Sequence, residues 1–65
     1  MSKYKLIGYR KGKSETKNLD TASMADAWAS EFADRGFKDI TIERDGIPIK
    51  VEDLPAYARE ENSEH

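Results

Sequence analysis

The residues able to carry acid–base chemistry in this sequence are carboxylates: Asp45 beside Glu43, and Glu60, Glu61 and Glu64. Catalytic carboxylate pairs need a pocket that drives their pKa values apart, and neither a turn nor a charged tail supplies one. The chain has no cysteine, and its one histidine is the last residue. It therefore lacks a thiolate nucleophile, a histidine base and a Cys/His metal set. The sequence predicts a protein that is not an enzyme and binds no cofactor and no metal.

Three large apolar side chains, Met24, Trp28 and Phe32, recur every four residues. They could line a ligand cavity, but that spacing is typical of one helix face packed on a core. A chain of 65 residues has little volume to spare for a cavity. We therefore assign these side chains to the core.

The third group of residues that could form a functional site is basic. Residues 1–17 carry six basic side chains and one acidic one, whereas the remainder carries five basic and twelve acidic, for a net charge of −2. Tyr4 and Tyr9 alternate with those cations, as on surfaces where bases stack and phosphates are neutralised. The pI of 5.3 and the acidic charge of the remaining residues disfavour binding to nucleic acid, because they repel its phosphates. The lysines have another common role, since lysines on an edge strand prevent aggregation. We favour the protective role and keep nucleic acid as the alternative.

Local patterns predict the elements that position these residues. Residues 3–9 read as a strand that ends in a turn containing Gly12, and the polar residues 14–19 read as a returning strand at the sheet edge. A helix is predicted over 24–35, with Ser23 as its N-cap, Gly36 as its left-handed stop and Phe37 touching Phe32.

After Phe37 the apolar period changes to two. Asp45-Gly46 predicts a two-residue type I′ turn, which pairs Arg44 with Ile47, Ile42 with Ile49 and Ile40 with Val51. In that register Pro48 lies opposite Glu43 at a non-hydrogen-bonded position, where a backbone N–H would point away from the neighbouring strand. Because proline has no N–H to offer a further strand on that side, the last strand is an outer one.

These elements predict an α+β fold, ββαββ, whose four-stranded antiparallel sheet has the order second, first, third, fourth strand, with the helix on one face. Either Tyr4, Leu6 and Gly8 or Ile7 and Tyr9 face the helix; we favour the first set, because Gly8 leaves room for the Trp28 indole. The expected core is Leu6, Met24, Trp28, Phe32, Phe37, Ile40, Ile42, Ile47, Ile49 and Val51.

The last stretch reads as a short helix or tail, with Asp53 as a candidate N-cap and Pro55 in the first turn. We expect it to cover part of the far sheet face. Residues 1–61 are expected to form one domain and 62–65 a disordered tail. The sequence shows no secretory h-region and no apolar run of about 18 residues, which predicts a cytoplasmic protein without a membrane contact.

A resemblance rests on the charged hairpin, the helix opening Ser23-Met24-Ala25-Asp26-Ala27-Trp28 and the exit through Gly36-Phe37 into a strand. This order resembles small phage-encoded proteins, most of all the phage inhibitors of host RNA polymerase, which use a ββαβ domain of this size. That family carries an arginine pair on the strand after the helix, where this sequence has Thr41, Glu43 and a single Arg44. The resemblance implies a binding protein rather than a particular partner.

We therefore expect a non-enzymatic protein-interaction module, an accessory protein of phage or prophage origin that modulates a host protein. The alternative is a small nucleic-acid-binding protein that uses the basic hairpin. The expected interaction surface consists of Lys5, Ile7, Tyr9, Arg10, Lys11, Lys13, Thr41, Glu43 and Arg44.

Overall fold

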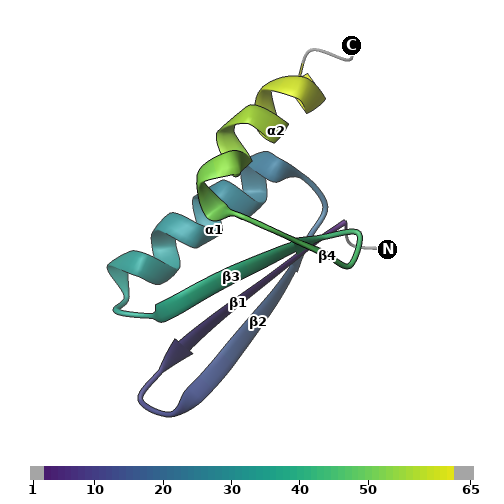
Figure 1. The fold of residues 1–65 in the computed structure, drawn as a ribbon. Helices are drawn as coiled ribbons and strands as arrows, with labels where there is room; N and C mark the ends of the chain where they lie inside the picture. Colours follow the sequence, from purple (N-terminus) through teal and green to yellow (C-terminus); the bar gives the residue numbers. More distant parts are fainter. Residues whose placement is uncertain (1–2, 63–65) are drawn as a thin grey trace.

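The computed structural model describes residues 3–62. Within them the chain forms two hairpins around a helix and ends in a second helix (Figure 1). The elements in chain order are β1 (Tyr4–Arg10), β2 (Lys13–Leu19), α1 (Ala22–Asp34), β3 (Lys38–Arg44), β4 (Ile47–Ile49), the 3₁₀ turn η1 (Val51–Asp53) and α2 (Leu54–Asn62).

The four strands form one antiparallel sheet in the order β2-β1-β3-β4, and both helices lie on the same side of it (Figure 1). This confirms the predicted α+β class, strand order and outer position of Pro48. The side chains of Tyr4 and Leu6 are fully buried under the helices and Gly8 is buried beside them, which confirms that this set faces α1. The opposite face of the sheet carries no helix of residues 3–62.

Both hairpins close with two-residue turns. Lys11 and Gly12 have φ of 50° and 77°, and Asp45 and Gly46 have φ of 53° and 82°, as type I′ turns require. The predicted pairs of Arg44 with Ile47 and Ile42 with Ile49 are present. The pair of Ile40 with Val51 was wrong, because β4 ends at Ile49 and the chain leaves the sheet through η1.

The helix α1 begins earlier than predicted. Its N-cap is Thr21, whose Oγ1 accepts from the Met24 N–H at 3.2 Å, so the assignment to Ser23 was wrong. The end is as expected: Gly36 N–H donates to Ala33 and Phe37 N–H to Phe32 in a Schellman motif. The Phe32 and Phe37 rings stack at 4.6 Å.

The core is built partly from small residues. Ala22, Ala25 and Ala29 are buried with Phe32, whereas Met24 is 46% exposed and Trp28 only partly buried. The helix is therefore rotated about its axis from the predicted orientation. The full set of buried apolar residues is Tyr4, Leu6, Leu19, Ala22, Ala25, Ala29, Phe32, Ile42 and Leu54.

Three further expectations about packing were wrong. Ile47 is 66% exposed, because β4 lies at the sheet edge. The room left by Gly8 is taken by Phe32, since a Cβ built there would lie 2.8 Å from Phe32 Cδ2. The C-terminal helix packs beside α1 and not on the far sheet face. It includes Asn62, where the tail was expected to begin; residues 63–65 of that expected tail lie outside the described residues.

Candidate interaction surface

Five of the nine predicted surface residues share the open face of the sheet. The register places Lys5 opposite Glu43 and Ile7 opposite Thr41, and Tyr9 follows on the same side of β1. Ile7 is partly buried, whereas Tyr9 is 46% exposed. These side chains form a flat, mixed polar and apolar area that no helix of the described chain covers.

Arg44 does not belong to this surface. It pairs with Tyr4 and Ile47, and its side chain lies on the helix-covered face. Its Nε donates to the Tyr4 hydroxyl at 3.3 Å, and its guanidinium lies 4.7 Å from the centre of the Tyr57 ring. The hydrogen bond to Tyr4 raises the pKa of Arg44 above its usual value. This side chain therefore ties α2 to the sheet and is not presented to a partner.

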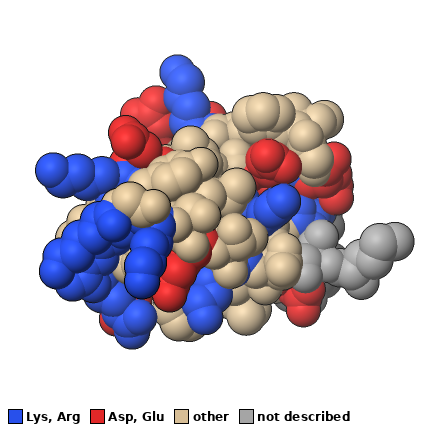
Figure 2. Space-filling model, turned by 90° about the horizontal axis from the view of Figure 1, so that it is seen from below, with Lys and Arg blue, Asp and Glu red and all other residues tan. Residues whose placement is uncertain are grey.

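A bulge in β3 enlarges the basic part of the surface. The β1–β3 register shifts between Ile7 and Tyr9, where Asp39 takes a φ of 51°. The shift places Lys38 opposite Tyr9, next to the tip of the β1–β2 hairpin. We call the four cations at this place the basic end: Arg10, Lys11, Lys13 and Lys38. Figure 2 shows Lys and Arg side chains gathered at one end of the molecule.

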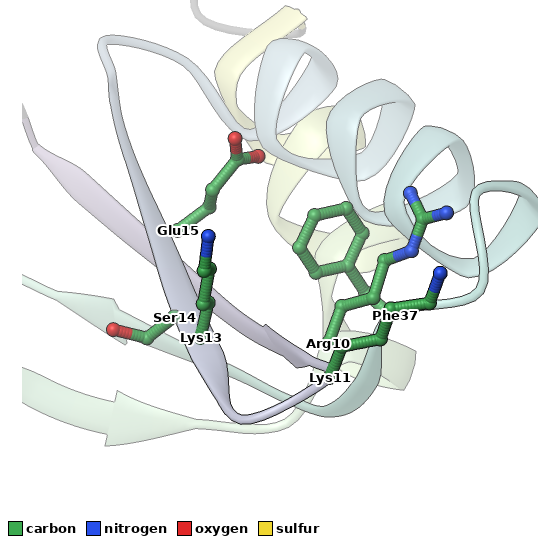
Figure 3. A pocket seen from close by; sticks show the side chains of 6 residues that line it. All are labelled: Arg10, Lys11, Lys13, Ser14, Glu15 and Phe37. Atoms are coloured by element: carbon green, nitrogen blue, oxygen red, sulfur yellow. The ribbon is translucent and has the colours of Figure 1, made fainter.

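A groove of about 420 Å³ lies on the helix side of the basic end (Figure 3). The ring of Phe37 forms one wall, and Lys13 and Glu15 project from β2 toward the helices, whereas Ser14 points away. The lining residues are Arg10, Lys11, Lys13, Ser14, Glu15 and Phe37. Three cations, one carboxylate and an aromatic ring give this groove a net positive charge.

A second hollow of about 380 Å³ lies beside the hairpin tip. It brings Tyr9 and Lys38 together with Asp39 and the turn between α1 and β3. The hairpin tip thus stands between two hollows, each lined by Arg10 and Lys11. Both hollows are open, so they suit a broad contact rather than an enclosed small ligand.

The ring of Trp28 on α1 is contacted by one cation from β2 and one from the end of its own helix. Lys17 Nζ is 4.6 Å from the centre of its ring, and the Arg35 guanidinium is 6.0 Å away on a side chain that also binds Glu31 at 3.0 Å. Such cation–ring contacts are favourable at exposed sites. Sequence reasoning missed this surface because it placed Trp28 in the core. The polar residues 13–18 could have indicated that Trp28 is exposed, since a polar strand offers little apolar area for an indole to pack against.

Among residues 3–62 no group of three or more Asp, Glu, His or Cys side chains is placed to bind a metal ion. None of the helices in that part of the chain is long and apolar enough to cross a membrane. Comparisons with protein-family models, with curated proteins and with solved structures gave no match.

Proposed function

We propose that this chain is a cytoplasmic, non-enzymatic protein-interaction module that binds an acidic surface of a partner protein. One observation carries the proposal: the basic end brings Arg10, Lys11, Lys13 and Lys38 together around two open hollows. The four cations come from two segments, which the Asp39 bulge places side by side. Opposite charge across a contact steers association and selects the partner.

The open sheet face extends this contact area. Tyr9 borders the hollow with Lys38, and its neighbours on the open face are Ile7 and Thr41. An exposed tyrosine supplies apolar area and a polar tip at little entropic cost, which suits it to a protein interface. The resemblance to small phage proteins supports a host protein as the partner, and modulation would follow from covering part of that protein's surface.

A pull-down from cell lysate with the tagged protein tests the proposal. We expect one protein to be recovered in stoichiometric amount and to survive nuclease treatment. Lys11→Glu combined with Lys13→Glu should abolish its recovery, because like charges then meet at the contact. Lys50→Glu, a single charge reversal away from the basic end, is the control, since this lysine is 77% exposed, lies in the segment that follows β4 and contacts the exposed Glu52 at 3.8 Å. Equal recovery by all three proteins would contradict a contact through the basic end.

The alternative is single-stranded nucleic acid. The observation that favours it is the exposed ring of Tyr9 beside Arg10, Lys11 and Lys38, since bases stack on such rings while cations neutralise phosphates. Against it, each hollow also holds a carboxylate, Glu15 in one and Asp39 in the other.

Fluorescence anisotropy with a labelled oligothymidylate separates the two functions. At about 0.15 M salt, where the Debye length is about 8 Å, we expect no binding. Micromolar binding that falls steeply with salt and is lost in the Lys11→Glu, Lys13→Glu variant would replace the protein-binding proposal with the nucleic-acid one.

A further inference from the structure

The outer strand β2 has an open hydrogen-bonding edge. It pairs with β1 at every position from Lys13 to Leu19 without a bulge. The pair that flanks a two-residue turn, here Arg10 with Lys13, is hydrogen-bonded, and such pairs alternate along the ladder. The backbone N–H and C=O groups of Ser14, Thr16 and Asn18 therefore point outward, where no strand of residues 3–62 lies.

The opposite edge of the sheet is closed to pairing. β4 has only three residues, and its central residue is Pro48, which has no N–H to donate. Short length, proline and lysine are the usual protections of an edge strand, and β2 has only lysine, the protection expected from the sequence. Its helix-side face carries charges of both signs, Lys13, Glu15 and Lys17, so a strand with the complementary pattern can still pair with it.

We propose that two copies of this chain pair antiparallel through β2, about a two-fold axis at Thr16, and form one continuous sheet. In this register Thr16 lies opposite Thr16, Ser14 opposite Asn18 and Glu15 opposite Lys17. The outward groups of Ser14, Thr16 and Asn18 make the new hydrogen-bonded pairs. Glu15 and Lys17 then fall at the non-hydrogen-bonded positions, where side chains come closest.

Charge selects this register. The axis at Thr16 creates two equivalent pairs of Glu15 with Lys17 and uses the whole of β2. Moving the axis to residue 15 places Glu15 opposite Glu15 and Lys13 opposite Lys17, and moving it to residue 17 places Lys17 opposite Lys17. Like charges directly opposite each other are unfavourable. Larger shifts leave most of β2 unpaired.

The position of Lys17 fits this pairing. Its Nζ lies over the Trp28 ring, which holds the side chain on the helix side of the sheet. That is the side on which Glu15 of the other copy arrives. On the opposite face, threonine opposite threonine and serine opposite asparagine are polar pairs able to hydrogen-bond across strands.

A second copy fits this edge better than an acidic strand from another protein. Such a strand would match Lys13 and Lys17 but would place a carboxylate opposite Glu15. The two-fold arrangement places no like charges opposite each other: it pairs Glu15 with Lys17 twice and sets Lys13 opposite Leu19. The dimer depends on the pair of Glu15 with Lys17, whereas the proposed function depends on the cations of the basic end, of which only Lys13 lies in β2. Oligomeric state and partner recovery are separate measurements, so the failure of one proposal can be told from the failure of the other.

Sedimentation equilibrium up to about 1 mM protein tests the dimer, because its population follows mass action. We expect dimerisation that Glu15→Lys and Lys17→Glu each weaken about tenfold or more, since each single change creates two like-charge pairs. Mixing the two variants restores opposite charges at both positions, so the heterodimer should be tighter than the homodimer of either variant. Glu15→Lys combined with Lys17→Glu should restore the homodimer, and Lys50→Glu should leave it unchanged.

A wild-type monomer at about 1 mM, or a dimer that these charge changes do not affect, would overturn the proposal. Hydrogen exchange gives a readout that needs no variant. The Thr16 amide should exchange fast in dilute protein and slowly in concentrated protein, whereas the Lys17 amide, bonded to β1, should be protected at both concentrations. Fast exchange of Thr16 at the higher concentration would equally contradict the dimer, whatever the pull-down shows.

Discussion

The Tyr4 hydroxyl donates a hydrogen bond of 2.6 Å to Glu61 Oε2, which joins the first strand to the last helix. The other oxygen of Glu61 accepts from the Ala22 N–H at 2.9 Å. Ala22 is the first residue of α1, so Glu61 satisfies one of the free N–H groups there and places a negative charge at the positive end of the helix dipole. One carboxylate thus holds α2 to both layers of the domain.

The first prediction concerns pH. Burial raises the pKa of Glu61, but the hydrogen bonds from Tyr4 and Ala22 and the charges of Lys3 and Arg44 outweigh it, so the pKa lies below its usual value of 4.5. A carboxyl whose pKa is lowered by folding stabilises the folded state above its unfolded pKa, and loses this contribution as the pH falls through the folded value. Thermal unfolding should therefore move to lower temperature below about pH 4.5.

Glu61→Gln is the variant that tests this assignment. At neutral pH it should lower the free energy of unfolding by about 1–2 kcal/mol, because charge-assisted hydrogen bonds are lost. Its melting temperature should also depend less on acid than that of the parent. If the melting temperature fell equally with acid in both proteins, the loss of stability would belong to other carboxylates.

The second prediction concerns Gly8. A Cβ at this position would lie 2.8 Å from Phe32 Cδ2 and 3.2 Å from Phe37 Cδ1. Since Phe32 is fully buried, its ring has little room to move, and Gly8→Ala should destabilise the domain by about 1–3 kcal/mol in chemical denaturation. In the background of Phe32→Leu the same change should cost less. Equal costs in both backgrounds would mean that the two residues do not interact.

The third prediction separates two aromatic residues of α1. Phe32→Ala should cost about 3–5 kcal/mol, because Phe32 is fully buried. Trp28→Ala should cost only about 1–2 kcal/mol, since Trp28 is partly buried and its ring is covered by Lys17 and Arg35. Urea unfolding followed by circular dichroism measures both. If Trp28→Ala lost more free energy of unfolding than Phe32→Ala, Trp28 would be a central core residue, as its spacing in the sequence predicted.

The fourth prediction concerns the turn between β3 and β4. Gly46 has a φ of 82°, which a β-branched residue resists. Gly46→Val should therefore lower stability by about 1–3 kcal/mol, whereas Gly46→Asn should cost less, because asparagine tolerates positive φ. Thermal melts of the two variants give the comparison. A valine variant as stable as the parent would mean that the turn relaxes without cost.

The sequence predicted those parts of the fold that depend on neighbouring residues. Asp45-Gly46 sets the β3–β4 register through its own backbone geometry, and Gly36-Phe37 ends α1 in the same local way. The orientation of α1 depends instead on contacts with distant segments. Ala22, Ala25 and Ala29 are small enough for α2 and the sheet to approach closely, and hydrophobicity alone gave more weight to Met24.

The same division holds for the surface. Arg10, Lys11 and Lys13 are close in the chain, so their gathering at one hairpin tip was predictable. Lys38 joins them only because Asp39 adopts a positive φ in the β3 bulge, a conformation that is uncommon for residues other than glycine. Arg44 lies off the predicted surface because it is two residues after Ile42 and so shares the helix-covered face of β3, a local pattern that the predicted surface did not take into account. Its contact with Tyr4, and the bond of 57 residues' span between Tyr4 and Glu61, are long-range, and no local pattern encodes them.

The approach of Phe32 to Gly8 has a consequence for nuclear magnetic resonance. One Hα of Gly8 takes the direction in which a Cβ would point and lies against the Phe32 ring. Protons this close to an aromatic ring experience its ring current, so the two Hα resonances of Gly8 should be separated widely in the folded protein. Gly12 and Gly46 have nothing within 4 Å of the corresponding position and serve as internal references. The splitting of a single glycine therefore reports whether α1 is seated on β1, without a label or a probe.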